Sequence, residues 1–145
     1  MNAEYNLERF VHAQESGFQN ALNEIKNGKK QSHWMWFIFP QIAGLGFSET
    51  SKFYAIKDVV EADLYLEHKV LGSRLIKISN ELLNIEGKTA SQIFGSPDDL
   101  KLKSCMTLFS LLQNTNPIFE AVLNKYFNGA KDLKTLQLIK INPSE

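Results

Sequence analysis

The chain has few of the residues that most often carry metal or redox chemistry. Its 145 residues include one cysteine, Cys105, and three isolated histidines without His-x-x-x-His spacing. A single cysteine excludes an internal disulfide framework and a thiolate-rich zinc site. Cys105 also lies in an apolar helical pattern with no nearby histidine to activate it as a nucleophile. We therefore expect no bound metal and no cofactor.

An excess of charge of either sign is also missing, because 16 basic side chains balance 16 acidic ones. This balance argues against a dedicated duplex-binding protein, whose affinity comes largely from clustered lysine and arginine. Lys26, Lys29 and Lys30 form a small basic cluster, but no stripe of alternating basic and aromatic residues accompanies them. Nucleic acid is therefore the least favoured of the partners considered.

No hydrophobic run is long enough to cross a membrane. The longest, Trp34 to Phe39, has six residues and is closed by Pro40, whereas a membrane span needs roughly 20. The first residues, Met1 to Tyr5, have no basic flank and no apolar run, so they do not resemble a secretory signal. We expect a cytoplasmic protein without membrane association.

Hydrophobic residues are nevertheless plentiful, at 43% of the chain, and their spacing is helical. Between Leu7 and Ile25, and again between Val70 and Leu83, they recur at steps of three and four, which predicts amphipathic helices. No period-two pattern recurs and no internal repeat is present. The sequence predicts one all-α domain over residues 1–145, with its core at about 6–139 and six to eight helices. The expected helix starts are Asn6, Ser32, Ser48, Asp58, Thr89, Ser96-Pro97, Asn116-Pro117 and Asp132.

The run from Trp34 to Phe39 is apolar on every face, so we expect it to be enclosed. A cap at Ser32 would make it a short helix ending before Pro40. A strand remains an alternative, because short apolar runs do not distinguish the two.

Three segments are more distinctive than helix packing requires: SHWMWFIFPQ at 32–41, HKVLGSRL at 68–75 and FGSPDDLKLKSCMTLF at 94–109. Together they resemble the signature blocks of domain-of-unknown-function family 1810, over about residues 7–138. This resemblance implies a small, mainly bacterial protein with a compact helical fold, and it brings no established activity. Members are sometimes labelled calpastatin, but that label does not suit a short, aromatic, non-repetitive chain.

Two residues are candidates for acid–base chemistry, His33 and Asp98. A cap at Ser32 would place His33 at a helix N-terminus, whose dipole favours the neutral imidazole that a general base needs. Each candidate also has a structural interpretation. His33 is then a histidine at the core edge bonded to backbone, and Asp98 is a helix-start carboxylate paired with Lys101.

Six further residues are candidates for holding a ligand. The Trp36 ring suits a base or sugar, although tryptophan in an apolar run is more often core. The glycine-containing loop at residues 40–48 leads to a helix start and offers backbone N–H groups to an anion, although an ordinary turn is the simpler interpretation. An arginine suits phosphate or carboxylate better than lysine does, although a surface ion pair is an equal alternative. The six residues are Trp36, Gln41, Gly44, Gly46, Arg74 and Lys101.

These candidates support two hypotheses. The first is a pocket for a small anionic ligand, phosphorylated or nucleotide-like, in a protein that is either an enzyme or a binder. His33 or Asp98 would then be the acid–base, and Arg74, Lys101 and backbone N–H groups would hold the anion. The second is a non-enzymatic protein-interaction module whose signature blocks serve packing. It predicts an exposed apolar patch and no polar-lined cavity.

Overall fold

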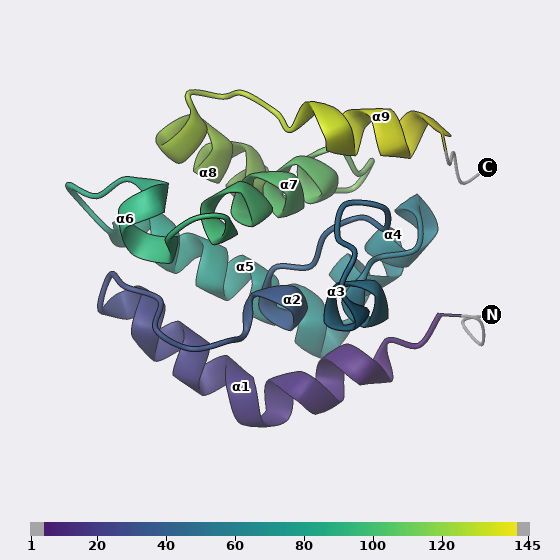
Figure 1. The fold of residues 1–145 in the computed structure, drawn as a ribbon, viewed down its shortest axis with the longest axis horizontal. Coiled ribbons are helices and arrows are strands. Elements are labelled where there is room, and N and C mark those ends of the chain that lie inside the picture. Colours follow the sequence, from purple (N-terminus) through teal and green to yellow (C-terminus); the bar gives the residue numbers. More distant parts are fainter. Residues whose placement is uncertain (1–4, 142–145) are drawn as a thin grey trace.

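A computed structural model describes residues 5–141 of the chain. This part contains nine α-helices joined by loops (Figure 1). The prediction of a single all-α domain is confirmed, and the helix count exceeds the expected six to eight because the helix at Lys69–Asn84 has a start of its own, capped by His68. Residues 1–4, most of the segment weighed as a signal sequence, lie outside the described residues. The helices are α1 Glu8–Lys26, α2 Met35–Ile38, α3 Glu49–Tyr54, α4 Val59–Glu67, α5 Lys69–Asn84, α6 Ala90–Phe94, α7 Asp98–Ser110, α8 Pro117–Phe127 and α9 Leu133–Ile141.

Helix α5 crosses the middle of the molecule, and the other helices pack around it (Figure 1). It contacts α1, α4 and α8, while α7 packs on α8 and is flanked by α6 and α9. Its apolar stripe, which includes Leu71, Leu75, Ile78 and Leu82, is fully enclosed, as the three- and four-residue spacing predicts. Within residues 5–141, none of the helices has the length and apolar character of a membrane span.

Four helix starts behave as the sequence predicts, and a fifth does so in a fuller form. The side chains of Ser48, Asp58, Asn116 and Asp132 each accept a hydrogen bond from a backbone N–H of the helix that follows. Thr89 forms a complete capping box with Gln92.

Three expected caps are wrong. Asn6 does not cap α1, because the helix starts one residue later than expected and the residue at the cap position is Leu7, which has no side-chain acceptor. Ser32 does not cap α2, because its hydroxyl donates to Glu24 instead, at 2.6 Å. At the start of α7 the residue before the helix is Pro97, not Ser96, and it offers no side-chain acceptor.

Glu24 determines how the chain leaves α1. Its carboxylate is buried and accepts hydrogen bonds from the backbone N–H groups of Gln31 and Ser32, from the Ser32 hydroxyl and from the Trp34 indole N–H. Burial raises the pKa of Glu24, but the hydrogen bonds from Ser32, Gln31 and Trp34 outweigh it and lower the pKa to about 2. The ionised carboxylate therefore fixes the link between α1 and α2.

Gly72 lets α4 and α5 approach closely. A Cβ atom at this position would lie 1.9 Å from the carbonyl oxygen of Leu66, far inside contact distance. The obstacle is backbone, so no side-chain rotation can relieve it. A glycine is required here by the turn between the two helices, not by its dihedral angles.

We predict that Glu24→Gln lowers the free energy of unfolding at pH 7 by about 2 kcal/mol, because a neutral amide replaces a carboxylate in several charge-assisted hydrogen bonds. The folded-state pKa lies below the unfolded value, so this stabilisation is complete above about pH 5 and is lost as the pH falls toward 2. The difference between variant and wild type, measured by urea unfolding at pH 7, 5 and 3, should shrink with falling pH. A pH-independent difference would contradict this, and exposed Glu15→Gln on the same helix is the control.

We predict that Gly72→Ala destabilises the fold by about 3 kcal/mol, since the added methyl group forces α4 away from α5. Thermal unfolding of Gly72→Ala and of its exposed neighbour Ser73→Ala gives the comparison, and the second variant should stay within about 0.5 kcal/mol of wild type. Equal effects of the two substitutions would show that the close approach is not a constraint.

Candidate functional site

A loop that carries α3 leaves the core and returns to it at a single point. Ile42 and Ile56, both buried, form a short parallel bridge: the Ala43 N–H donates to the Ile56 carbonyl and the Ile56 N–H donates to the Gln41 carbonyl, each at 2.8 Å. Residues 43–55 therefore form a closed loop on the surface, of the kind that often carries function. No residue of α3 itself is buried.

Arg9 of α1 binds the last residues of this loop. Its Nε donates to the Phe53 carbonyl at 2.7 Å and its Nη2 to the Ala55 carbonyl at 2.8 Å. The same guanidinium forms an ion pair with Glu61 at 2.8 Å, with both side chains almost fully enclosed. One arginine thus fixes the end of α3 against α1 and α4.

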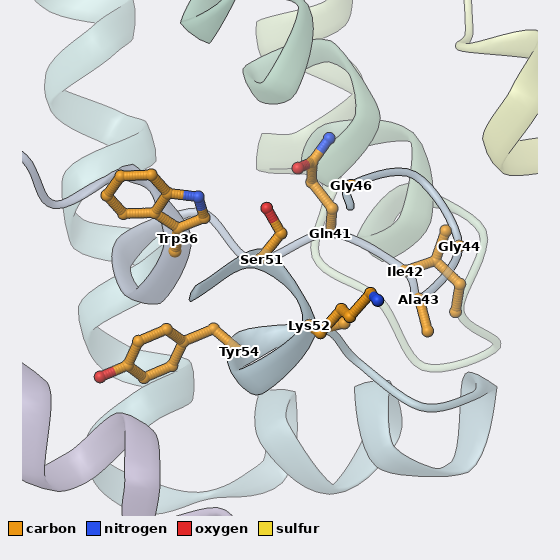
Figure 2. Close-up of a pocket in the computed structure, with 10 residues that line it drawn as sticks. Trp36, Gln41, Ile42, Ala43, Gly44, Gly46, Ser51, Lys52 and Tyr54 are labelled. Atoms are coloured by element: carbon orange, nitrogen blue, oxygen red, sulfur yellow. The ribbon is translucent and has the colours of Figure 1, made fainter. Parts of the chain in front are cut away.

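A pocket of about 110 Å³ lies between α2, this loop and α3 (Figure 2). In the close-up, the Trp36 and Tyr54 rings stand on one side, the segment around Ala43 and Gly44 on the other, and Ser51 lies between them. Its full lining is Trp36, Gln41, Ile42, Ala43, Gly44, Gly46, Ser51, Lys52, Tyr54 and Ala55. We call this the inner pocket.

A wider, more open hollow of about 560 Å³ adjoins the inner pocket and shares Trp36 and Tyr54 with it. Phe53 on α3 is 55% exposed here. The Phe37 ring is seated where Gly17 of α1 has no side chain, since a Cβ at Gly17 would lie 2.7 Å from it. The lining residues of this outer hollow are His33, Trp36, Phe37, Glu49, Thr50, Phe53 and Tyr54.

The polar groups of the inner pocket favour negative charge. Among residues 5–141, Lys52 is its one charged lining residue, and neither aspartate nor glutamate lines it. The Gln41 side-chain amide makes no hydrogen bond within residues 5–141, and the Gly44 and Gly46 N–H groups donate none to the backbone there. Unpaired amide groups at a recess can serve a ligand.

The sequence predicts that the run from Trp34 to Phe39 is enclosed throughout. This prediction is wrong, because only part of the run is buried. Trp34 is 2% exposed and belongs to the core, where its ring lies 6.2 Å from that of Phe39. In the single helical turn that follows, α2, the side chains of Met35 and Ile38 are buried, while those of Trp36 and Phe37 are only partly buried. The α2 turn, and not a strand, separates a core tryptophan from a pocket tryptophan.

Of the eight residues singled out in the sequence, four lie in the inner pocket: Trp36, Gln41, Gly44 and Gly46. His33 is exposed and lies at the edge of the outer hollow. The helix-dipole argument for His33 is wrong, because Ser32 is not a cap and α2 begins only at Met35. The helix-terminus argument for the glycine loop also loses its basis, because α3 has six residues and Ser48 already accepts from its Ser51 N–H.

Asp98 and Lys101 lie behind Trp36. The Asp98 carboxylate contacts Lys30 at 2.9 Å and Lys101 at 3.3 Å, so both of its oxygens are engaged by lysines. The Lys101 ammonium also lies 5.1 Å from the centre of the Trp36 ring. The expected pairing of Asp98 with Lys101 is present, whereas Asp99 accepts from the Leu100 N–H.

Arg74 lines neither the inner pocket nor the outer hollow. Its Nη1 donates to the Gln14 side chain at 3.4 Å, and its guanidinium lies over the Phe18 ring. Gln14 in turn donates to the Phe37 carbonyl at 2.7 Å. Arg74 therefore supports a wall of the outer hollow from behind, and the side chain is not available to an anion in the pocket.

A family model described as "Protein of unknown function (DUF1810)" matches residues 4–139. The chain belongs to this family. It is also similar to a solved structure, the crystal structure of the conserved hypothetical protein Rv1873 from Mycobacterium tuberculosis, with a TM-score of 0.92 and 42% identity over 94% of this chain and 98% of that chain. No curated protein matches the chain.

The family relationship confirms the resemblance seen in the sequence, and neither of these relatives comes with an assigned activity. Among residues 5–141 no three or more His, Cys, Asp or Glu side chains gather as metal ligands would. Burial raises the pKa of the enclosed Cys105 thiol well above its ordinary value, which opposes thiolate chemistry there.

Six lining residues of the inner pocket were not predicted from the sequence, and three of them, Ser51, Lys52 and Tyr54, lie on α3. Their position depends on the closure of the loop at Ile42 and Ile56, a contact without a local sequence signal. The one available clue was the Ser48 cap, which fixes α3 and so places Ser51 and Lys52 on its first turns.

We predict that the two tryptophans differ in their access to solvent. Acrylamide should quench the fluorescence of Trp34→Phe, in which Trp36 remains, several-fold more efficiently than that of Trp36→Phe, because Trp36 borders the pocket and Trp34 is enclosed. Stern–Volmer plots at a temperature well below unfolding measure this. Similar quenching constants for the two variants would show that the pocket is closed to small solutes.

Proposed function

We propose that the protein binds a small anionic ligand in the inner pocket. The observation that carries the proposal is the chemistry of the lining: within the described part of the chain, Lys52 is the one charged residue, and the Gln41 amide, which has no hydrogen-bond partner there, shares the recess with it. Ammonium, amide and hydroxyl groups are the usual donors to phosphate and carboxylate oxygens. The aromatic side formed by Trp36 and Tyr54 gives such a ligand an apolar surface to pack on.

Within this proposal, Gln41, Ser51 and Lys52 donate hydrogen bonds to the anion, together with the backbone N–H groups at Gly44 and Gly46. The absence of a carboxylate from the lining matters as much as the lysine, because a nearby acid would repel the ligand. The Ser51 hydroxyl lies 2.7 Å from that of Ser48, so it can donate a hydrogen bond to the Ser48 oxygen when no ligand is bound.

The remaining candidates take different roles. His33, exposed at the outer hollow, is the candidate acid–base if the bound ligand is also transformed. Asp98 and Lys101 act through Trp36, because their ion pair places an ammonium group on its ring. Arg74 acts through Gln14 on Phe37, not on the ligand. This distribution favours a binding protein over an enzyme, since one acid–base candidate is held between two lysines.

The alternative is a protein-interaction module. The observation that favours it is a shallow, mostly apolar hollow on α9, lined by Leu133, Leu136, Gln137, Ile139 and Lys140, with Leu133 highly exposed. We place it second because the inner pocket is polar, and a module that uses its signature blocks only for packing has no need of such a cavity.

We predict that inorganic phosphate binds at the inner pocket and that Lys52→Met weakens this binding about tenfold, as expected for the loss of one charge-assisted hydrogen bond. The readout is the titration of the Gly44 and Gly46 backbone amides and of the Gln41 side-chain amide in two-dimensional NMR spectra. Saturable shifts of these signals in the wild type, weakened in the variant, support the proposal.

The matched control is Lys77→Met, an exposed lysine on α5 that lines neither the inner pocket nor the outer hollow. It removes the same charge from the molecule, so any loss through net charge alone appears in both variants. Equal binding by the two variants, or no saturable shift of the pocket amides in the wild type, would overturn the proposal.

A further inference from the structure

We infer that the ligand is a nucleoside monophosphate, with its phosphate in the inner pocket and its base on the aromatic surface of the outer hollow. This inference rests on the proposed function and extends it from an anion to a class of molecule. Three observations carry it: the sizes of the two spaces, the distribution of charge between them and the rings that they share.

The sizes indicate a ligand with two parts. At about 110 Å³ the inner pocket has room for a phosphate group but is below the roughly 300–1,000 Å³ typical of sites for whole small molecules. The outer hollow, at about 560 Å³, falls within that range. Since the two spaces adjoin at Trp36 and Tyr54, one molecule that extends through both would fill a site of ordinary size.

The charges orient this ligand. Of the residues that the structure describes, Lys52 and no acidic residue lines the inner pocket, whereas Glu49 and no lysine or arginine lines the outer hollow. A phosphate is therefore attracted to the inner end and repelled from the outer one. A base carries no charge at neutral pH, and its amino groups can donate to a carboxylate such as Glu49.

The rings of the outer hollow suit a flat, aromatic group. Five of its lining residues carry a ring: His33, Trp36, Phe37, Phe53 and Tyr54. Phe53 meets the Tyr54 ring at 81°, edge to face, and remains more than half exposed. Exposed aromatic side chains beside a cationic group are the usual platform for single bases, because every base has a face that stacks.

Trp36, like Tyr54, lines both the inner pocket and the outer hollow. The Lys101 ammonium occupies a position 5.1 Å from its ring centre, and no ring contact joins Trp36 to Tyr54 within residues 5–141. A ribose, which links base to phosphate, would lie beside these two side chains.

The experiment compares adenosine 5′-monophosphate, ribose 5-phosphate and adenosine by calorimetry and by NMR titration. We expect the nucleotide to bind at least about tenfold more tightly than ribose 5-phosphate, because one stacked base contributes that much. Phe53→Ala should reduce the nucleotide affinity toward that of ribose 5-phosphate and leave ribose 5-phosphate binding unchanged. Lys52→Met should weaken both phosphorylated ligands.

The matched control is Phe47→Ala, which removes a ring that is 84% exposed on the same loop but lines neither space. Unchanged ribose 5-phosphate binding by Phe53→Ala also shows that this variant folds. If the nucleotide binds no better than ribose 5-phosphate, or Phe47→Ala weakens it as much as Phe53→Ala does, the inference fails while anion binding stands. If no phosphorylated ligand binds, the proposed function fails as well.

Discussion

Two backbone hydrogen bonds at Ile42 and Ile56 determine whether this protein has a pocket at all. They join the ends of a loop whose helix, α3, has no fully buried residue and packs on the core through the partly buried Tyr54, whose ring lies 5.8 Å from that of Phe10. Both isoleucines are enclosed, so the bonds are shielded from competing water. Arg9 adds the second constraint by binding the Phe53 and Ala55 carbonyls from α1. The loop is therefore held at the Ile42–Ile56 closure and at residues 53–55, and the inner pocket lies between this loop and α2.

The same region shows how one turn of helix divides a hydrophobic run between core and surface. Trp34 is drawn inward by the hydrogen bond from its indole N–H to Glu24, at 2.8 Å. From this fixed point, the α2 turn sends Met35 and Ile38 to the interior and leaves Trp36 beside the pocket. Burying a carboxylate is costly unless it is fully hydrogen-bonded, and here that carboxylate sets the orientation of the aromatic wall.

The sequence was sufficient for the fold class and for most helix starts, because these depend on local spacing and on short polar caps such as Ser48 and Thr89. It was insufficient at three starts, in one of which a longer-range partner takes the capping group. Ser32 resembles a cap in the sequence, but Glu24 takes its hydroxyl. Four of the eight candidate residues lie together because they follow one another closely in the chain. Lys52 and Tyr54 join them through a loop closure that has no local signal.

The two arginines of the chain, Arg9 and Arg74, show that a distinctive sequence context does not reveal a residue's role. Arg74 was the more conspicuous, within a distinctive segment, yet Arg9 is the one that holds the site's loop. Arg74 still reaches the site indirectly, through Gln14 and the Phe37 carbonyl.

The third distinctive segment reaches the same place from α7, through the Lys101 ammonium on Trp36 and through the Phe94 ring, 6.4 Å from Trp34. All three distinctive segments therefore converge on residues 34–37. Lys101 meets the Trp36 ring directly, whereas the hydrogen bond from Gln14 ends on the backbone carbonyl of Phe37 and not on its ring. A ring held in one orientation suits a binding surface, because a ring that turns freely gives a ligand no defined platform.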